Sequence, residues 1–420
     1  MTINRRKFIG ISSLTIGAWG IVPNVLFGNK GSQKSEKLHD LTKDVKPLVR
    51  ADFLKRQEKA KELMRKSDID GLLLTGDVNM RYFLNMSWWR SERLFGAILN
   101  LKGDPIWVCP AFEEKRAREV ISFGNDIRTW EEHESPYGLI KGIIKDLNGK
   151  KLAVGPTVRN FVVESLRKEL SGTGISLVAG LPVSEGCRGI KSEKELTYMD
   201  LANKITKMAY REAFTKLEAG MTPSELRAHV SFAHKQLGAN GSSYPLFGPM
   251  SAFPHGTRET RNLSDGDIIL NDGGCSVEGY RSDVTRTIVF GKPTDKQKRV
   301  FDLILKAQRT AMKAVRPGVT CESIDHAARK VIEDGGFGPG YKFFAHRLGH
   351  GIGMEGHEYP YLVKGNDLKM KPGMTFSNEP GIYIYGEFGI RLEDCFVVTS
   401  EGGRYLGGML TESLDSPFGT

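Results

Sequence analysis

Two aspartates that flank a glycine-bearing segment constrain the fold of this chain more than any other feature. Asp272 ends the apolar run IILN, and Asp283 opens the alternating run DVTRTIV, eleven positions later. Gly273, Gly274 and Gly279 lie between them and favour tight turns. The pattern predicts a β-hairpin that brings both carboxylates to one end of a sheet. Buried carboxylates side by side repel each other strongly unless a cation neutralises them.

A second group of polar residues lies far downstream. The stretch HRLGHGIGMEGH supplies His346, His350 and His357, while Glu379 stands in SNEPG and Glu393 in IRLED. Four carboxylates and one imidazole suit two divalent ions about 3.5 to 4 Å apart that share a hydroxide. The mostly oxygen donor set favours Mn, Co, Fe or Zn. The alternative for each carboxylate taken alone is an ordinary turn residue after a strand.

The first half of the chain alternates short apolar stretches with helical patterns. The first expected strand starts near Gly71, and three more cover 94–101, 104–110 and 151–155. The expected helices cover 53–66, 111–120, 139–147 and 161–170. This alternation predicts a small α/β domain over residues 49–186, with a largely parallel or mixed sheet. Its glycines follow no GxxxxGK[ST] or GxGxxG spacing, so no phosphate loop is predicted.

The second half, residues 187–415, predicts an α+β domain. Ser192 and Glu195 have the form of a capping box, and Thr222-Pro223 marks another helix start. The expected helices cover 192–217, 222–238, 294–315 and 324–334. The expected strands cover 267–274, 282–290, 374–384 and 389–399. At 420 residues, two such domains agree with the length of the chain.

The amino terminus has the pattern of an export signal. Arg5 and Arg6 precede an apolar run that glycines and a proline interrupt, which suits a signal peptide over residues 1–29 better than a membrane span. The paired arginines resemble the twin-arginine signal, so we expect an exported, periplasmic or otherwise extracytoplasmic protein. The alternative is a signal-anchor helix. Residues 30–48 are polar and rich in lysine, and they predict a tether before the folded region.

Charge and cysteine usage exclude several classes of protein. The formal charge of +10 is spread among acidic residues, which favours a solvated mixed surface over a nucleic-acid interface. The five cysteines are far apart and form no CxxC pair, so neither a disulfide framework nor a thiolate zinc site is predicted.

The ordered set of ligand-type residues resembles the family of methionine aminopeptidase, aminopeptidase P, prolidase and creatinase. The family motif is Asp, Asp eleven residues later, then His, Glu and Glu. The matching residues, which the resemblance assigns as metal ligands, are Asp272, Asp283, His350, Glu379 and Glu393. The resemblance implies a pita-bread catalytic domain, and the α/β domain before it is typical of the aminopeptidase P, prolidase and creatinase branch. It also implies two divalent metal ions that activate a bridging water, and a homodimer.

The same resemblance assigns working residues around the ligands. Glu379 would also act as the catalytic base. His255 matches a working histidine that the branch keeps before the first ligand Asp, and His357 matches a histidine that contacts the substrate near the scissile bond. His346 matches a pocket histidine. Arg391 is assigned to the substrate pocket, more as a partner of the carboxylates than as a catalytic group. The remaining histidines are interpreted as structural: His39, His133, His229, His234 and His326.

Three functions remain open at this point. The first is a metallopeptidase that cleaves the bond between an amino-terminal residue and a following proline in short peptides. The second is a metal-dependent hydrolase or lyase of a small non-peptide metabolite on the same scaffold. The third is a non-catalytic binding protein, which would have no need of an intact ligand set. Creatinase-like amidinohydrolases lack that set, so a creatine-type reaction is not expected.

Overall fold

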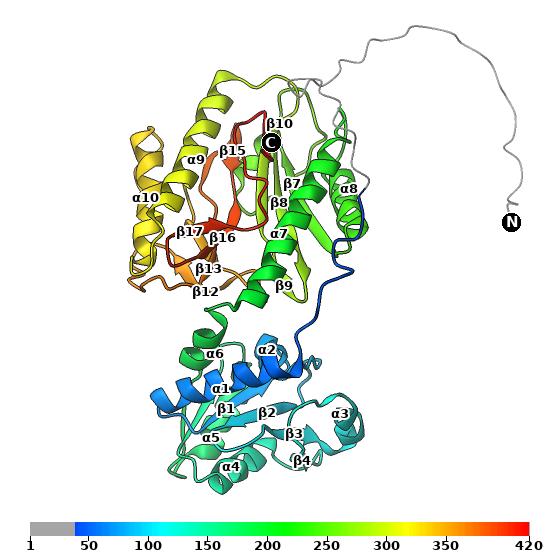
Figure 1. Ribbon diagram of the computed structural model, residues 1–420, viewed down its shortest axis with the longest axis vertical. Coiled ribbons are helices and arrows are strands. Elements are labelled where there is room, and N and C mark those ends of the chain that lie inside the picture. Colours follow the sequence, from blue (N-terminus) through cyan, green and yellow to red (C-terminus); the bar gives the residue numbers. More distant parts are fainter. Residues whose placement is uncertain (1–37, 420) are drawn as a thin grey trace, which may run out of the picture.

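The computed structural model describes residues 38–419, which form two domains stacked along the long axis of the molecule (Figure 1). The predicted signal peptide, with Arg5 and Arg6, lies outside the described residues. Within residues 38–419, no helix combines the length and the apolar character that a membrane span requires.

The N-terminal domain contains one mixed sheet, as predicted, but with six strands, because β4 and β6 were not predicted. The strand order is β4-β3-β2-β1-β5-β6; β2 is antiparallel to β1 and β3, and the other pairs are parallel. The strands are β1 (Gly71–Thr75), β2 (Gly96–Asn100), β3 (Ile106–Pro110), β4 (Ile127–Trp130), β5 (Lys151–Val154) and β6 (Ser176–Ala179). The helices are α1 (Arg50–Lys66), α2 (Val78–Leu84), α3 (Glu114–Val120), α4 (Pro136–Asp146), α5 (Asn160–Leu170) and α6 (Leu181–Arg188).

The C-terminal domain places its strands between two pairs of helices, with α7 and α8 on one side and α9 and α10 on the other (Figure 1). The helices are α7 (Glu193–Phe214), α8 (Pro223–Gln236), α9 (Asp295–Ala314) and α10 (Cys321–Asp334). One sheet contains β7 (Gly241–Phe247), β8 (Ile268–Val277) and β10 (Val284–Val289), with β9 (Tyr280–Arg281) pairing with β8. The other contains β11 (Gly349–Gly351), β12 (Glu358–Leu362), β13 (Thr375–Asn378), β16 (Asp394–Val398) and β17 (Gly403–Tyr405), beside the hairpin β14 (Gly381–Ile384) and β15 (Phe388–Arg391).

The two faces of β8 explain why this strand lies in the middle of the domain. Ile268 and Leu270 belong to the apolar core that includes α9 and α10. Ile269, between them, packs with Tyr210 and Phe214 of α7. A strand that is apolar on both faces must be covered on both sides, and the two helix pairs provide that cover.

The helix starts follow the predicted capping chemistry. The Ser192 hydroxyl accepts a hydrogen bond from the Glu195 backbone N–H, and the Glu195 carboxylate accepts one from the Ser192 backbone N–H at 2.7 Å. Thr222 forms the same reciprocal box at the start of α8. These bonds satisfy amide groups that the first helical turn leaves unpaired.

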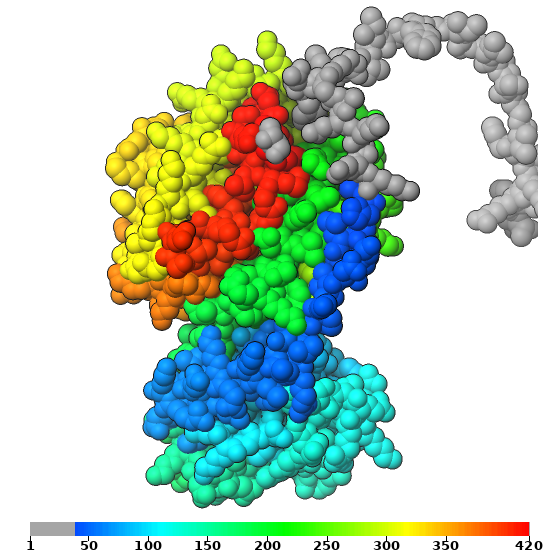
Figure 2. All heavy atoms as spheres, in the orientation of Figure 1, coloured from blue at the N-terminus to red at the C-terminus, as the bar shows by residue number. Residues whose placement is uncertain are grey.

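Part of the predicted tether differs from expectation. Residues 38–48 run along the C-terminal domain (Figure 2), where the Leu41 backbone N–H donates to the Leu237 carbonyl at 3.1 Å. Leu38, Leu41 and Val45 pack against the core of that domain. These apolar residues within a polar stretch are the physical reason, because burying them holds the segment in place.

Buried charged groups join the two domains. Arg188 of α6 contacts the carboxylates of Glu355 and Glu358, and Lys191 also reaches Glu358 at 3.2 Å. Arg56 of α1 donates to the Glu195 carboxylate at 2.9 Å. The predicted boundary between residues 186 and 187 lies inside α6, close to these contacts.

Candidate metal centre

The hairpin formed by β8 and β10 brings Asp272 and Asp283 together. Thr285 of β10 lies opposite Asp272 of β8, and Asp283 immediately precedes β10. Asp272 lies inside β8, which continues to Val277, beyond the predicted end of that strand at residue 274. The hairpin itself agrees with the pattern of the sequence.

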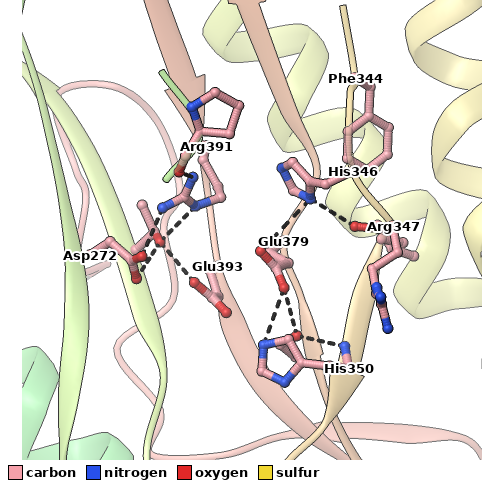
Figure 3. Close-up of polar contacts among 12 residues, drawn as sticks. Asp272, Phe344, His346, Arg347, His350, Glu379, Arg391 and Glu393 are labelled. Atoms are coloured by element: carbon pink, nitrogen blue, oxygen red, sulfur yellow. Dashed lines mark hydrogen bonds and ion pairs between the residues drawn. The ribbon is translucent and has the colours of Figure 1, made fainter. Parts of the chain in front are cut away.

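The second sheet supplies the other three proposed ligands. His350 lies on β11, Glu379 directly follows β13, and Glu393 lies between β15 and β16 (Figure 3). The His350 Nε2 atom lies 3.3 Å from Glu379 Oε1 and 3.7 Å from Asp283 Oδ2. Overlapping groups of ligand atoms, each within 4.8 Å of one another, include all five proposed ligands.

These carboxylates are hard to ionise together. Burial, with the negative charge of Asp272 and Glu379 added, raises the pKa of Asp283 well above its usual value. Burial also raises the pKa of Glu379 to about 7, and burial together with neighbouring carboxylates raises that of Glu393. Such a cluster is stabilised as anions when cations lie among the oxygen atoms.

The orientation of His350 also fits a metal. Its Nδ1 lies 3.1 Å from the Gly351 carbonyl, which can only accept a hydrogen bond, so Nδ1 carries the proton. Nε2 therefore directs a lone pair toward the carboxylates of Asp283 and Glu379. Burial lowers the pKa of His350 to about 4, which keeps the ring neutral. A lone pair that faces two carboxylates is well placed to share a cation with them, so the donor set fits the implied divalent ions.

Arg391 holds one side of the cluster. This buried guanidinium donates to Asp272 Oδ2 at 2.8 Å and to the Thr285 hydroxyl at 3.1 Å (Figure 3). The Thr285 hydroxyl lies 3.0 Å from Asp272 Oδ1 and 2.7 Å from Glu393 Oε2. The structure thus places Arg391 as a partner of the carboxylates, with Thr285 linking two proposed ligands.

His346 is fixed by a chain of hydrogen bonds. Its Nδ1 lies 2.8 Å from the Arg347 carbonyl and so donates to it. Its Nε2 must then accept, and the Tyr383 hydroxyl lies 2.8 Å away. The same hydroxyl accepts from Arg391 at 2.9 Å. Burial lowers the pKa of His346 to about 3, so this ring is uncharged where it lies beside Glu379.

His255 and His357 lie at the exposed side of the centre. The His357 ring stacks on the His350 ring, with 3.7 Å between the centroids. His255 is exposed and follows Pro254, whose carbonyl accepts from Arg391 at 2.9 Å. Both side chains are exposed, and their action on a substrate stays a prediction. Asp283, His350 and His357 also form one possible ligand group.

Several residues that hold the site were not predicted. Besides Thr285 and Tyr383, a buried cluster fixes the backbone on either side of Glu393. Arg286 donates to the Glu393 carbonyl at 2.9 Å and to the Asp394 carboxylate at 2.8 Å. Lys207 of α7 lies 2.7 Å from the same carboxylate. No local sequence pattern predicts these contacts, because the residues that make them are far apart in the sequence.

Comparison with known proteins gives the family. Residues 197–400 match metallopeptidase family M24, and residues 56–190 match the creatinase/prolidase N-terminal domain. An uncharacterized peptidase of Staphylococcus aureus is 32% identical, with 82% of this chain and 96% of the relative covered. The chain belongs to the M24 metallopeptidases, and the predicted fold class is confirmed.

Solved structures agree with this assignment. Dipeptidase PepE from Mycobacterium ulcerans is 31% identical with a TM-score of 0.79, covering 86% of this chain and 96% of that one. Xaa-Pro dipeptidase from Bacillus anthracis is 28% identical with a TM-score of 0.74, covering 84% and 97%. Prolidase from Thermococcus sibiricus is 31% identical with a TM-score of 0.75, covering 84% and 96%.

Proposed function

We propose that this metallopeptidase holds two divalent ions and hydrolyses the bond between an amino-terminal residue and a following proline. The single observation that carries the proposal is the overlap of ligand groups that join His350 with the four carboxylates, with the neutral Nε2 of His350 facing Asp283 and Glu379. The similarity to an Xaa-Pro dipeptidase and a prolidase supports the choice of bond. Asp272, Asp283, His350, Glu379 and Glu393 would hold the metals.

Bound divalent ions would supply a hydroxide nucleophile at neutral pH and polarise the scissile carbonyl. The chain supplies the proton transfers. Glu379, which lies beside His350 among the proposed ligands, is suited to accept the proton of the nucleophile. It would then release this proton to the leaving nitrogen of proline.

The exposed histidines would act on the substrate. His357, stacked on His350, and His255, on the segment that Arg391 holds through Pro254, can approach a carbonyl bound at the centre. Hydrogen bonds from these rings would stabilise the negative charge that develops on the carbonyl oxygen. Arg391 would hold Asp272 in place throughout.

Removing the metals tests the proposal directly. We expect the purified protein to contain about two divalent ions per chain and to lose Xaa-Pro hydrolysis when a chelator removes them. Elemental analysis measures the metal content. Assays with Xaa-Pro dipeptides and Xaa-Pro-Xaa tripeptides measure the activity, with non-proline dipeptides as the control. Full activity in a metal-free sample would contradict the proposal, and equal rates on non-proline peptides would contradict the specificity.

We also propose export through the twin-arginine pathway, supported by the sequence of the first residues. Replacing Arg5 and Arg6 together by lysine should retain the protein in the cytoplasm, because that pathway reads the arginine pair. Cell fractionation measures the result, and replacement of Lys7 by arginine serves as a control. Export of the double variant would contradict this route.

A further inference from the structure

One buried ion pair on α10 lies away from the proposed ligands. Arg329 donates from Nε and Nη2 to the two carboxylate oxygens of Asp325, each at 3.0 Å. The two side chains are only 9% and 2% exposed. A pair buried to this degree is costly unless its remaining donors and acceptors also find partners.

Those partners lie on the segment 340–348, which precedes β11. Arg329 donates to the carbonyls of Gly340 at 3.2 Å, Phe344 at 2.8 Å and His346 at 2.9 Å. Its guanidinium carbon also lies 4.1 Å from the centre of the Tyr341 ring and 4.2 Å from that of Phe344. One side chain thus fixes most of the segment.

Asp325 holds the end of the segment that enters the metal centre. The Leu348 backbone N–H donates to Asp325 Oδ1 at 2.9 Å. The Leu348 carbonyl in turn accepts from the backbone N–H of Glu379 at 2.9 Å. Leu348 therefore connects the ion pair to one proposed ligand by a hydrogen bond and to His350 by two residues of chain. Figure 3 shows His346 of this segment and His350 of the following strand β11, with Glu379 between the two rings.

We propose that Asp325 and Arg329 are positioning residues that hold His350 and Glu379 at the spacing a metal requires before any metal binds. The inference rests on the proposed function only in taking His350 and Glu379 as metal ligands. Residues that support metal ligands from outside commonly influence metal affinity, and replacing them weakens it.

The chemistry of the pair explains why arginine is needed. The planar guanidinium serves a carboxylate and three carbonyls at once, whereas a lysine ammonium is a point charge with three donors. Arg329→Lys therefore keeps the charge but cannot make all these contacts. Lys330→Met is a matched control: Lys330 forms the same i,i+4 pair on α10 with Asp334, but those side chains are 60% and 64% exposed.

The first measurement uses metal-free protein and needs no activity. Hydrogen exchange followed by mass spectrometry should show the amides of residues 340–350 exchanging roughly tenfold faster or more in Arg329→Lys, because several hydrogen bonds are lost. The amides of α7 should keep their protection. Lys330→Met should match the unmodified protein throughout.

The second measurement is titration with Mn²⁺ alone. Arg329→Lys should bind Mn²⁺ about 10- to 100-fold more weakly, with the control unchanged. Asp325→Asn, which keeps an acceptor for Leu348 but loses the paired charge, should show the same two effects and decides the matter if Arg329→Lys does not fold.

Two results would overturn the inference: unchanged exchange and unchanged Mn²⁺ affinity, or faster exchange throughout the domain together with a lower melting temperature. Failure of the unmodified protein to bind Mn²⁺ would instead count against the proposed function, and the exchange data would still decide whether the pair holds the segment.

Discussion

Replacing Asp283 with alanine is expected to abolish metal binding and peptidase activity together. Asp283 belongs to two of the three overlapping ligand groups, so its loss damages both. The metal-free variant should nevertheless be at least as stable as the metal-free parent at neutral pH. Burial and neighbouring carboxylates raise the pKa of Asp283, so removing it relieves an unfavourable cluster of charges.

Elemental analysis, steady-state kinetics and thermal unfolding of the metal-free proteins measure these three effects. Asp302→Ala, at an exposed position on α9, is the control and should leave all three unchanged. An Asp283→Ala variant that keeps its metals would remove Asp283 from the ligand set. A large loss of stability in the metal-free state would identify it as a structural residue instead.

Replacing His357 with alanine should separate catalysis from metal binding. The side chain is exposed and stacks on the His350 ring, so it can leave without disturbing the buried carboxylates. We expect the metal content to stay and kcat to fall by roughly 10² to 10³-fold, the usual loss for one donor to a developing oxyanion.

His229→Ala, at an exposed position on α8, provides the matched control and should be fully active. Unchanged turnover in His357→Ala would exclude this residue from the mechanism. A metal-free variant would mean that His357 is itself a ligand, within the group it forms with Asp283 and His350.

Much of the scaffold could be predicted because local patterns encode it. The alternating run after Asp283 predicts β10, and the Ser192 and Thr222 capping boxes predict the starts of α7 and α8. The stretch that closes the first domain was not predicted as helical, although Pro182 allows α6 to begin there. The apolar residues of 38–48 were hidden by the lysines around them.

Other residues around the ligands could not be predicted for a different reason. Thr285 reaches Glu393 across 108 positions, and Arg286 reaches the Glu393 carbonyl across 107. Such contacts depend on how sheets register and pack, which no short window of sequence contains. Asp325–Arg329 and Lys330–Asp334 have the same spacing on one helix, and only their burial distinguishes them.

The buried charges between the domains limit how the molecule can be taken apart in the laboratory. Glu358, next to His357, is 5% exposed and meets Arg188 of the first domain as well as Lys191. A fragment that began after residue 189 would lack Arg188, so the buried Glu358 carboxylate would keep only Lys191 as a cationic partner. This loss would occur next to His357, which is proposed to act on the substrate. The first domain therefore contributes part of the interior that supports the substrate side of the metal centre. Removing this domain would change the surroundings of the site as well as the size of the protein.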